Sequence, residues 1–68
     1  MSDTLIRVGK NIRQIRIDRN LSQADLAKLL RADKAYISRI ENGKKNLTVS
    51  SLERLGRVLN VAISKLLK

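Results

Sequence analysis

The chain has 68 residues, a formal net charge of +9, a single aromatic residue and neither cysteine nor histidine. Its length predicts one domain spanning residues 1–68, and a domain this small needs a compact core of leucine, isoleucine, valine and alanine. The missing residue types exclude disulfides, thiol nucleophiles, imidazole bases and histidine–cysteine zinc sites. We therefore expect a protein that is not an enzyme and that carries no metal or cofactor.

The distribution of charge and hydrophobicity indicates the cellular compartment of the protein and the kind of partner that it binds. No apolar run is long enough to span a membrane, and the N-terminal segment has an acid before its first base and no unbroken apolar stretch. We therefore expect a cytoplasmic protein. Its 15 basic residues exceed the 6 acidic ones and are spread along the whole chain, which is typical of a folded domain that binds a polyanion. Nucleic acid and an anionic membrane surface both fit this charge.

The hydrophobic pattern has a helical period from the start of the chain. Leu5, Val8, Ile12 and Ile15 lie on one stripe, which predicts a first helix that ends at about Arg19. No segment alternates with a period of two, so we expect no strand.

The second and third predicted helices are short and are joined by only three residues. Ser22 and Asp25 form the pattern of a capping box before a helix over residues 23–30, and Asp33 can cap a third helix over residues 34–42. Helices of about two turns are not stable alone, so tertiary contacts must hold this pair together. This arrangement predicts a helix-turn-helix over about residues 23–42.

The remaining third of the chain predicts two more helices. Gly43 suits a left-handed end to the third helix, and Thr48 can cap a fourth helix that ends near Asn60. A short fifth helix is predicted over about residues 63–67. The fold class that follows is all-α, a compact bundle of five helices.

The third helix has two distinct faces. Ile37 and Ile40 point inward together, and Glu41 lies at the edge of that stripe. The opposite face, with Lys34 and Tyr36 flanking its first turn, carries small, hydroxyl, guanidinium and amide groups: Ala35, Ser38, Arg39 and Asn42. Such groups can read base edges, since arginine pairs with guanine and alanine contacts a thymine methyl.

The segment SQADLAKLLRADKAYISRIENGKKN resembles the helix-turn-helix of the Cro/C1-type (XRE) repressor family. The matching positions are Gln23, Leu26, Ala27, Ile37, Ser38, Ile40, Glu41 and Gly43. The resemblance covers nearly the whole chain and implies a lambda-repressor-like DNA-binding domain whose partner is double-stranded DNA.

The resemblance also implies a role for each matching position. Base readout in the major groove falls to Lys34, Ala35, Tyr36, Ser38 and Arg39. Phosphate contacts fall to Gln23, Asn42, Lys44, Lys45 and Asn46. Arg16 and Glu41 are expected to form a structural pair. Two simpler interpretations stay open: Tyr36 as a half-buried packing residue, and Lys44 with Lys45 as a solvated turn.

Two positions depart from the family pattern. Arg31 stands where such proteins usually have a glycine with positive φ, and Ala62 stands where a serine commonly caps the last helix.

One small domain makes too few base contacts for a specific operator, so we expect a homodimer on a pseudo-palindromic site. The expected interface residues are in the C-terminal segment: Val61, Ile63, Leu66 and Leu67. The stretch AYISRIENGKKNLT is most similar to restriction–modification controller proteins, which predicts a transcriptional regulator, activating or repressing. RNA polymerase and a toxin both stay open as its protein partner. Two alternatives stay open: an antitoxin that binds a toxin and autoregulates its operon, and a non-specific binder of nucleic acid or membrane.

Overall fold

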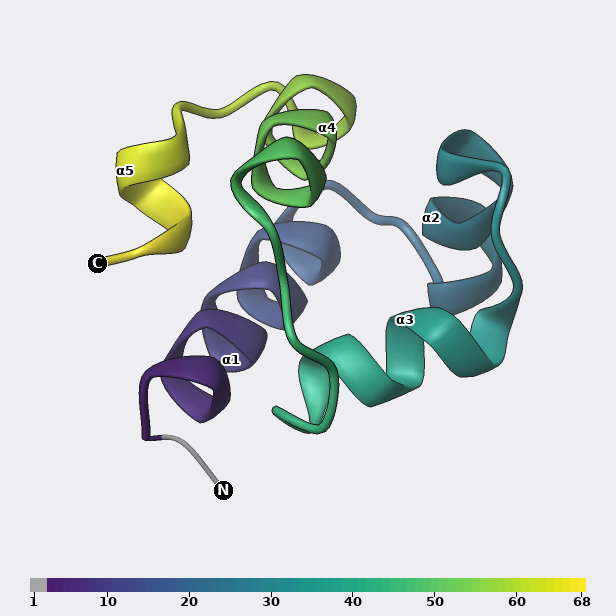
Figure 1. Cartoon of the computed structure of the whole chain (residues 1–68). Helices are drawn as coiled ribbons and strands as arrows, with labels where there is room; N and C mark the ends of the chain where they lie inside the picture. Colours follow the sequence, from purple (N-terminus) through teal and green to yellow (C-terminus); the bar gives the residue numbers. More distant parts are fainter. Residues whose placement is uncertain (1–2) are drawn as a thin grey trace.

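Residues 3–68, which the computed structural model describes, form five α-helices and no strand (Figure 1). The helices are α1 (Asp3–Asp18), α2 (Gln23–Leu30), α3 (Lys34–Glu41), α4 (Val49–Leu59) and α5 (Ile63–Leu66). The all-α prediction is confirmed, and the predicted helix ends differ from the observed ones by no more than one residue. Within this range, no helix is both long enough and apolar enough to cross a membrane.

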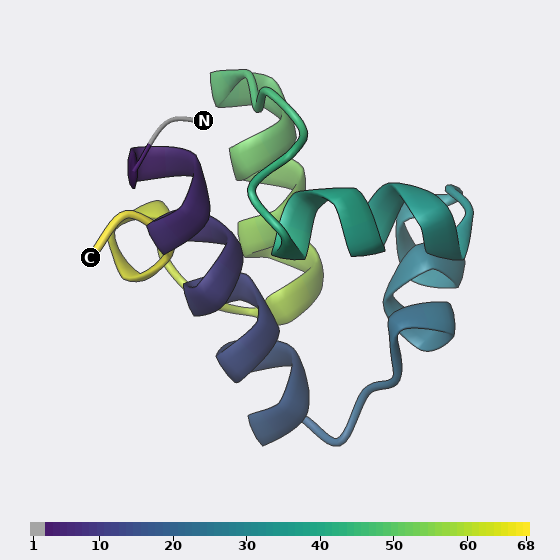
Figure 2. The same cartoon turned by 90° about the horizontal axis from the view of Figure 1, so that it is seen from below.

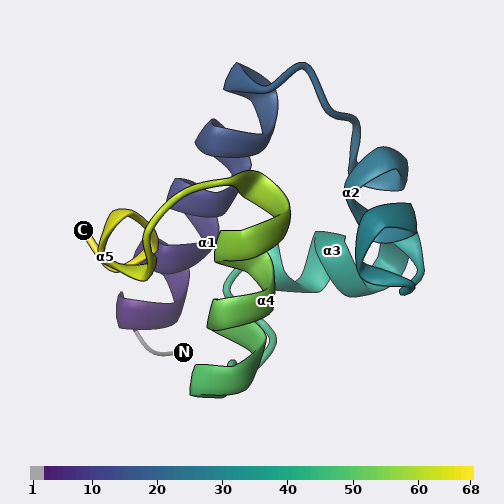
Figure 3. The ribbon, with the colours of Figure 1, turned by 90° about the horizontal axis from the view of Figure 1, so that it is seen from above.

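The helices are arranged with α1 and α4 in the middle of the molecule. The short pair α2 and α3 lies on one side of them and α5 lies on the other, as Figures 2 and 3 show from two opposite directions. The helix-turn-helix is therefore far from the last helix, and each end of the molecule has its own exposed surface.

A single aliphatic core holds this arrangement together. All five helices contribute to it. Its buried members are Val8, Ile12, Leu26, Ala27, Leu30, Ile37, Ile40, Leu55, Leu59 and Leu66. The two inward isoleucines of α3 are among them, so the inner face predicted for that helix is confirmed.

The start of α2 is fixed by the capping box that the sequence predicts. The Ser22 hydroxyl accepts from the backbone N–H of Asp25 at 2.9 Å, and the Asp25 carboxylate accepts from the backbone N–H of Ser22 at 2.9 Å. The hydrogen bonds with Ser22 hold the pKa of Asp25 below its ordinary value, and the bond with the Ser22 backbone has the larger effect. The positive charge of Lys28 lowers this pKa further. The local sequence alone thus determines where α2 begins.

The starts of α3 and α4 follow the same rule, and the start of α5 does not. Asp33 accepts from the third backbone N–H of α3 at 2.8 Å, and Thr48 accepts from the third backbone N–H of α4 at 3.1 Å. Ala62 precedes α5 without any side-chain cap, as its methyl group requires.

Side chains from distant helices also bond to helix C-terminal carbonyls. The Arg19 guanidinium donates to the carbonyl of Leu59 at 2.7 Å, and that of Arg54 donates to the carbonyl of Leu30 at 2.6 Å. Asn11 donates to the carbonyl of Leu66 at 2.9 Å. These bonds fasten α1 to α4 and α5, and α4 to α2, and they satisfy groups that a helix end leaves unpaired.

Helix α1 approaches the end of α3 closely. A Cβ atom at Gly9 would lie 2.4 Å from the carbonyl oxygen of Ile40 and 2.8 Å from that of Glu41. Just beyond α3, Gly43 has φ +70°, and a Cβ there would lie 2.8 Å from the Cα of Ile6. Only glycine fits at either point without a shift of the backbone.

The turn between α2 and α3 has the strained conformation that the sequence predicts. Arg31 ends α2 with φ 57° and ψ 42°, in the left-handed region that disfavours residues with a Cβ. Arg31→Gly is therefore expected to raise the free energy of unfolding by about 1 kcal/mol and the Tm by about 4–8 °C. Thermal unfolding followed by circular dichroism measures this shift.

Two other left-handed residues provide a control for that change. Asn20 and Asn60 have φ of 59° and 58°, and asparagine tolerates this region better than arginine. Asn20→Gly and Asn60→Gly should therefore raise the Tm less than Arg31→Gly does. If the two asparagine variants raise the Tm as much as Arg31→Gly or more, the strain is not specific to Arg31.

Candidate nucleic-acid interface

The outer face of α3 is accessible along its length. Lys34, Ala35 and Arg39 are exposed, and Ser38 is half-buried beside them. The inner face is anchored in the core by Ile37 and Ile40. The helix therefore presents a guanidinium, an ammonium, a hydroxyl and a methyl group from a backbone that is firmly held.

Tyr36 has a mixed position. Its side chain is half-buried and packs against the core, and the ammonium of Lys45 lies 5.7 Å from the centre of its ring. This distance is within the range of a cation–π contact. The ring thus has a packing role, and it also brings the loop after α3 back against that helix.

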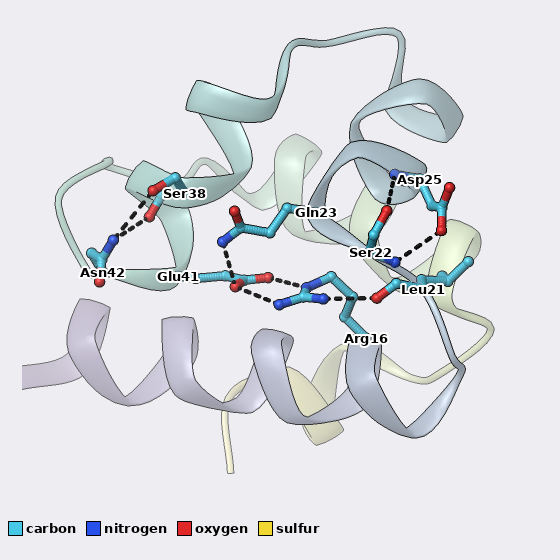
Figure 4. A network of polar contacts seen from close by, with 8 residues as sticks. All are labelled: Arg16, Leu21, Ser22, Gln23, Asp25, Ser38, Glu41 and Asn42. Carbon is cyan, nitrogen blue, oxygen red and sulfur yellow. Dashed lines mark hydrogen bonds and ion pairs between the residues drawn. The ribbon is translucent and has the colours of Figure 1, made fainter.

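A buried ion pair joins α1 to the end of α3. Arg16 Nε lies 2.6 Å from Glu41 Oε2, and Arg16 Nη2 donates to Glu41 Oε1 at 3.1 Å. A third guanidinium nitrogen donates to the carbonyl of Leu21 at 2.7 Å (Figure 4). The two residues expected as a structural pair are thus in contact, and each is only 8% exposed.

Gln23 joins this network, a contact that the sequence analysis missed. Its side-chain Nε2 donates to Glu41 Oε1 at 3.1 Å, so Glu41 accepts bonds from α1 and from the first residue of α2 (Figure 4). One amide hydrogen of Gln23 is committed to Glu41, and the other is left for an outside acceptor. No local sequence signal marks a contact between residues so far apart.

The end of α3 and the loop after it carry the remaining predicted phosphate contacts. Asn42 donates from Nδ2 to the carbonyl of Ser38 at 2.8 Å, which holds its amide against the last turn. Lys44, Lys45 and Asn46 are exposed on the loop that leads to α4. All the predicted phosphate residues thus reach the surface, although Gln23 and Asn42 also bond within the protein.

A polar hollow of about 350 Å³ lies where three helices meet. We call it the three-helix hollow. It is lined by Arg13, Arg16, Gln23, Glu41 and Asn42. Two of these residues are predicted phosphate contacts, whereas Arg13 was not singled out from the sequence.

A second hollow of about 500 Å³ lies between α4 and α5. It is lined by Glu53, Gly56, Arg57, Asn60, Val61, Ala62 and Ile63. Val61 and Ile63 are half-buried here, and Leu67 nearby in sequence is 44% exposed.

Leu66 requires a correction. The sequence predicts it at the dimer contact, but its side chain is fully buried in the core of the monomer. A helix of four residues is too short to show a hydrophobic period, so its inward residue could not be told from its outward ones.

The fold and this surface define a small domain whose short second helix packs across a reading helix, the arrangement of a DNA-binding helix-turn-helix. The helix-turn-helix family profile matches residues 12–66, and the chain belongs to that family. It is a DNA-binding regulator of transcription.

Individual relatives agree with this assignment. The control protein C.MunI from a Mycoplasma species is 36% identical over 67 residues, which cover 97% of this chain and 90% of that protein. The control protein C.SmaI from Serratia marcescens is 37% identical over 60 residues, covering 88% of this chain and 71% of that protein. The crystal structure of the restriction-modification controller protein C.AhdI from Aeromonas hydrophila superposes with a TM-score of 0.85 at 29% identity, covering 91% and 90% of the two chains.

Proposed function

We propose that this protein is a restriction–modification controller that acts in the cytoplasm as a homodimer on a pseudo-palindromic operator. The observation that carries the proposal is the accessible outer face of α3, held in place by buried isoleucines and by the Arg16–Glu41 pair. The similarity to several control proteins along nearly the whole chain supports the finer assignment.

The mechanism begins with α3 in the major groove. Arg39 can pair with the O6 and N7 atoms of a guanine, and Ala35 can contact a thymine methyl. The other proposed base contacts come from Lys34, Tyr36 and Ser38. Phosphates on either side are bound by Gln23, Asn42, Lys44, Lys45 and Asn46, which fix the register without reading sequence. Once bound to its operator, the protein regulates transcription by excluding RNA polymerase or by contacting it.

The second copy of the chain is proposed to dock on the hollow between α4 and α5. Val61, Ile63 and the exposed Leu67 supply apolar surface there. Glu53 and Arg57 are both exposed on that face of α4, and within residues 3–68 they form no ion pair with each other. Across a two-fold axis each glutamate can face the partner's arginine, which makes the surface complementary to itself.

Selection from random duplex DNA tests the proposed specificity. We expect enrichment of a symmetric motif, followed by a steep loss of affinity with salt, with a log–log slope of about −0.9 for each phosphate contacted. Arg39→Ala should then weaken binding by about 1–3 kcal/mol and relax one base position, because it removes a base contact. Lys45→Ala should weaken all sequences alike. Failure to enrich a symmetric motif, or equal and sequence-blind losses from both variants, would contradict sequence-specific regulation.

Charge reversal tests the proposed dimer. Glu53→Arg and Arg57→Glu should each be monomeric, because like charges then face each other across the axis. A mixture of the two variants should form a heterodimer, because each reversed charge again meets its opposite. Sedimentation velocity of the separate and mixed variants gives the masses. If the single variants dimerise as the wild type does, this surface is not the interface.

A further inference from the structure

Arg13 is an exposed cation whose side chain has no partner among residues 3–68. It lies on α1 and lines the three-helix hollow, yet it forms no hydrogen bond or ion pair with any residue from 3 to 68. The positions one helical turn away from it, residues 9, 10, 16 and 17, contain no acid. No acidic neighbour on its own helix therefore neutralises its charge.

The only acid that lines the hollow is already neutralised. Glu41 uses both carboxylate oxygens, one toward Arg16 Nε and the other toward Arg16 Nη2 and Gln23 Nε2. The nearby Asp25 carboxylate is turned to the backbone N–H of Ser22 and is not part of the lining. Two guanidinium groups against one carboxylate leave the hollow with one surplus positive charge, and that charge belongs to Arg13.

A further polar group of the hollow also favours an anion. Gln23 commits one amide hydrogen to Glu41 and retains a second one, whereas Asn42 Nδ2 donates to the carbonyl of Ser38 at 2.8 Å and to its hydroxyl at 3.4 Å. The hollow of about 350 Å³ corresponds to on the order of ten waters, which is ample for one phosphate group with part of its hydration shell. A neutral amide donor beside an unpaired guanidinium is suited to bind a phosphate oxygen, since charge-assisted bonds are the strong ones.

We infer that Arg13 is a phosphate-binding residue and that the three-helix hollow holds a single phosphodiester of the operator backbone. Arg13 supplies the charge from α1, and Gln23 supplies a hydrogen bond from the start of α2. Because its planar guanidinium can bond two phosphate oxygens at once, arginine suits this position better than lysine. This inference adds a contact from α1 to the proposed function and rests on the DNA binding described there.

The first test removes the charge of Arg13 and measures affinity by fluorescence anisotropy over a salt titration. Arg13→Gln should weaken binding of the selected operator and of random duplex alike by about tenfold at moderate salt. The log–log salt slope should become shallower by about 0.9 for each protomer bound. Arg13→Lys keeps the charge and should restore the slope while recovering only part of the affinity.

A matched control separates a local contact from the general field of the protein. Lys65→Gln removes one exposed positive charge from α5, on the far side of the molecule from α2 and α3 (Figure 1). It should leave the affinity and the salt slope close to those of the wild type. The Tm of Arg13→Gln should stay within about 2 °C of the wild type, because the side chain is exposed and unpaired.

The second test identifies the phosphate. In a series of operators, one phosphate at a time is replaced by a neutral methylphosphonate. At one position per half-site, this replacement should lower the affinity of the wild type about tenfold, whereas it should lower the affinity of Arg13→Gln little. The inference is overturned if Arg13→Gln and Lys65→Gln behave alike, or if no phosphate couples to Arg13. Those outcomes leave the proposed function intact, which fails instead if the wild type enriches no symmetric motif.

Discussion

Replacing Glu41 with alanine is expected to destabilise the domain by about 3–5 kcal/mol, because the buried guanidinium of Arg16 is then left without its counter-charge. At about 0.05–0.15 kcal/mol per residue, a chain of 68 residues has a total stability of only about 3–10 kcal/mol. The expected loss therefore lies between about a third of that total stability and all of it. Urea denaturation, monitored by far-UV circular dichroism, gives the free energy of unfolding.

A double variant is the matched control for this experiment. Arg16→Met with Glu41→Leu removes both charges and keeps side chains of similar volume, so the protein should be far more stable than Glu41→Ala alone. The double variant should nevertheless bind DNA less well, because Gln23 loses the acceptor that holds its amide. A loss below about 1 kcal/mol for Glu41→Ala would indicate that the ion pair behaves like an exposed one.

Replacing Gly9 with alanine is expected to lower the free energy of unfolding, although the same substitution within a helix usually raises it. In an exposed helix interior, alanine is favoured over glycine by about 1 kcal/mol. Here the added Cβ would lie 2.4 Å from the carbonyl oxygen of Ile40, so α1 and the end of α3 must move apart. Net destabilisation of about 1–3 kcal/mol is expected, measured by the same denaturation experiment.

The neighbouring residue provides the comparison. Lys10 is exposed on the same helix, so Lys10→Ala should change the free energy of unfolding by no more than about 0.5 kcal/mol. If Gly9→Ala instead stabilises the domain, the close approach of α1 to α3 does not exist in solution.

Apart from the Arg16–Glu41 contact, which the family resemblance implied, the features that the sequence predicted correctly are those set by neighbouring residues. Ser22, Asp33 and Thr48 each cap the helix that follows, because a cap needs only a side chain and the backbone N–H three residues later. The left-handed Arg31 follows from the family pattern at one position. Each of these signals lies within a few residues of sequence, so it can be recognised without the three-dimensional structure.

The features that were missed depend on how the helices pack. Arg19 and Arg54 reach carbonyl groups on other helices, and nothing local distinguishes them from solvated cations. The bond from Gln23 to Glu41 and the place of Arg13 in the hollow appear only when three helices are brought together. Leu66 was placed on the wrong face for the same reason.

The close contact at Gly9 has a consequence for the operator itself. With α1 seated on the carbonyl groups at the end of α3, and Glu41 bonded from two other helices, the reading helix has no freedom to tilt within its domain. Any mismatch between two rigid protomers and a straight duplex must then be taken up by bending or twisting of the DNA. In the proposed dimer, the base pairs between the two half-sites should therefore influence affinity through their stiffness, with flexible pyrimidine–purine steps and rigid A-tracts behaving differently.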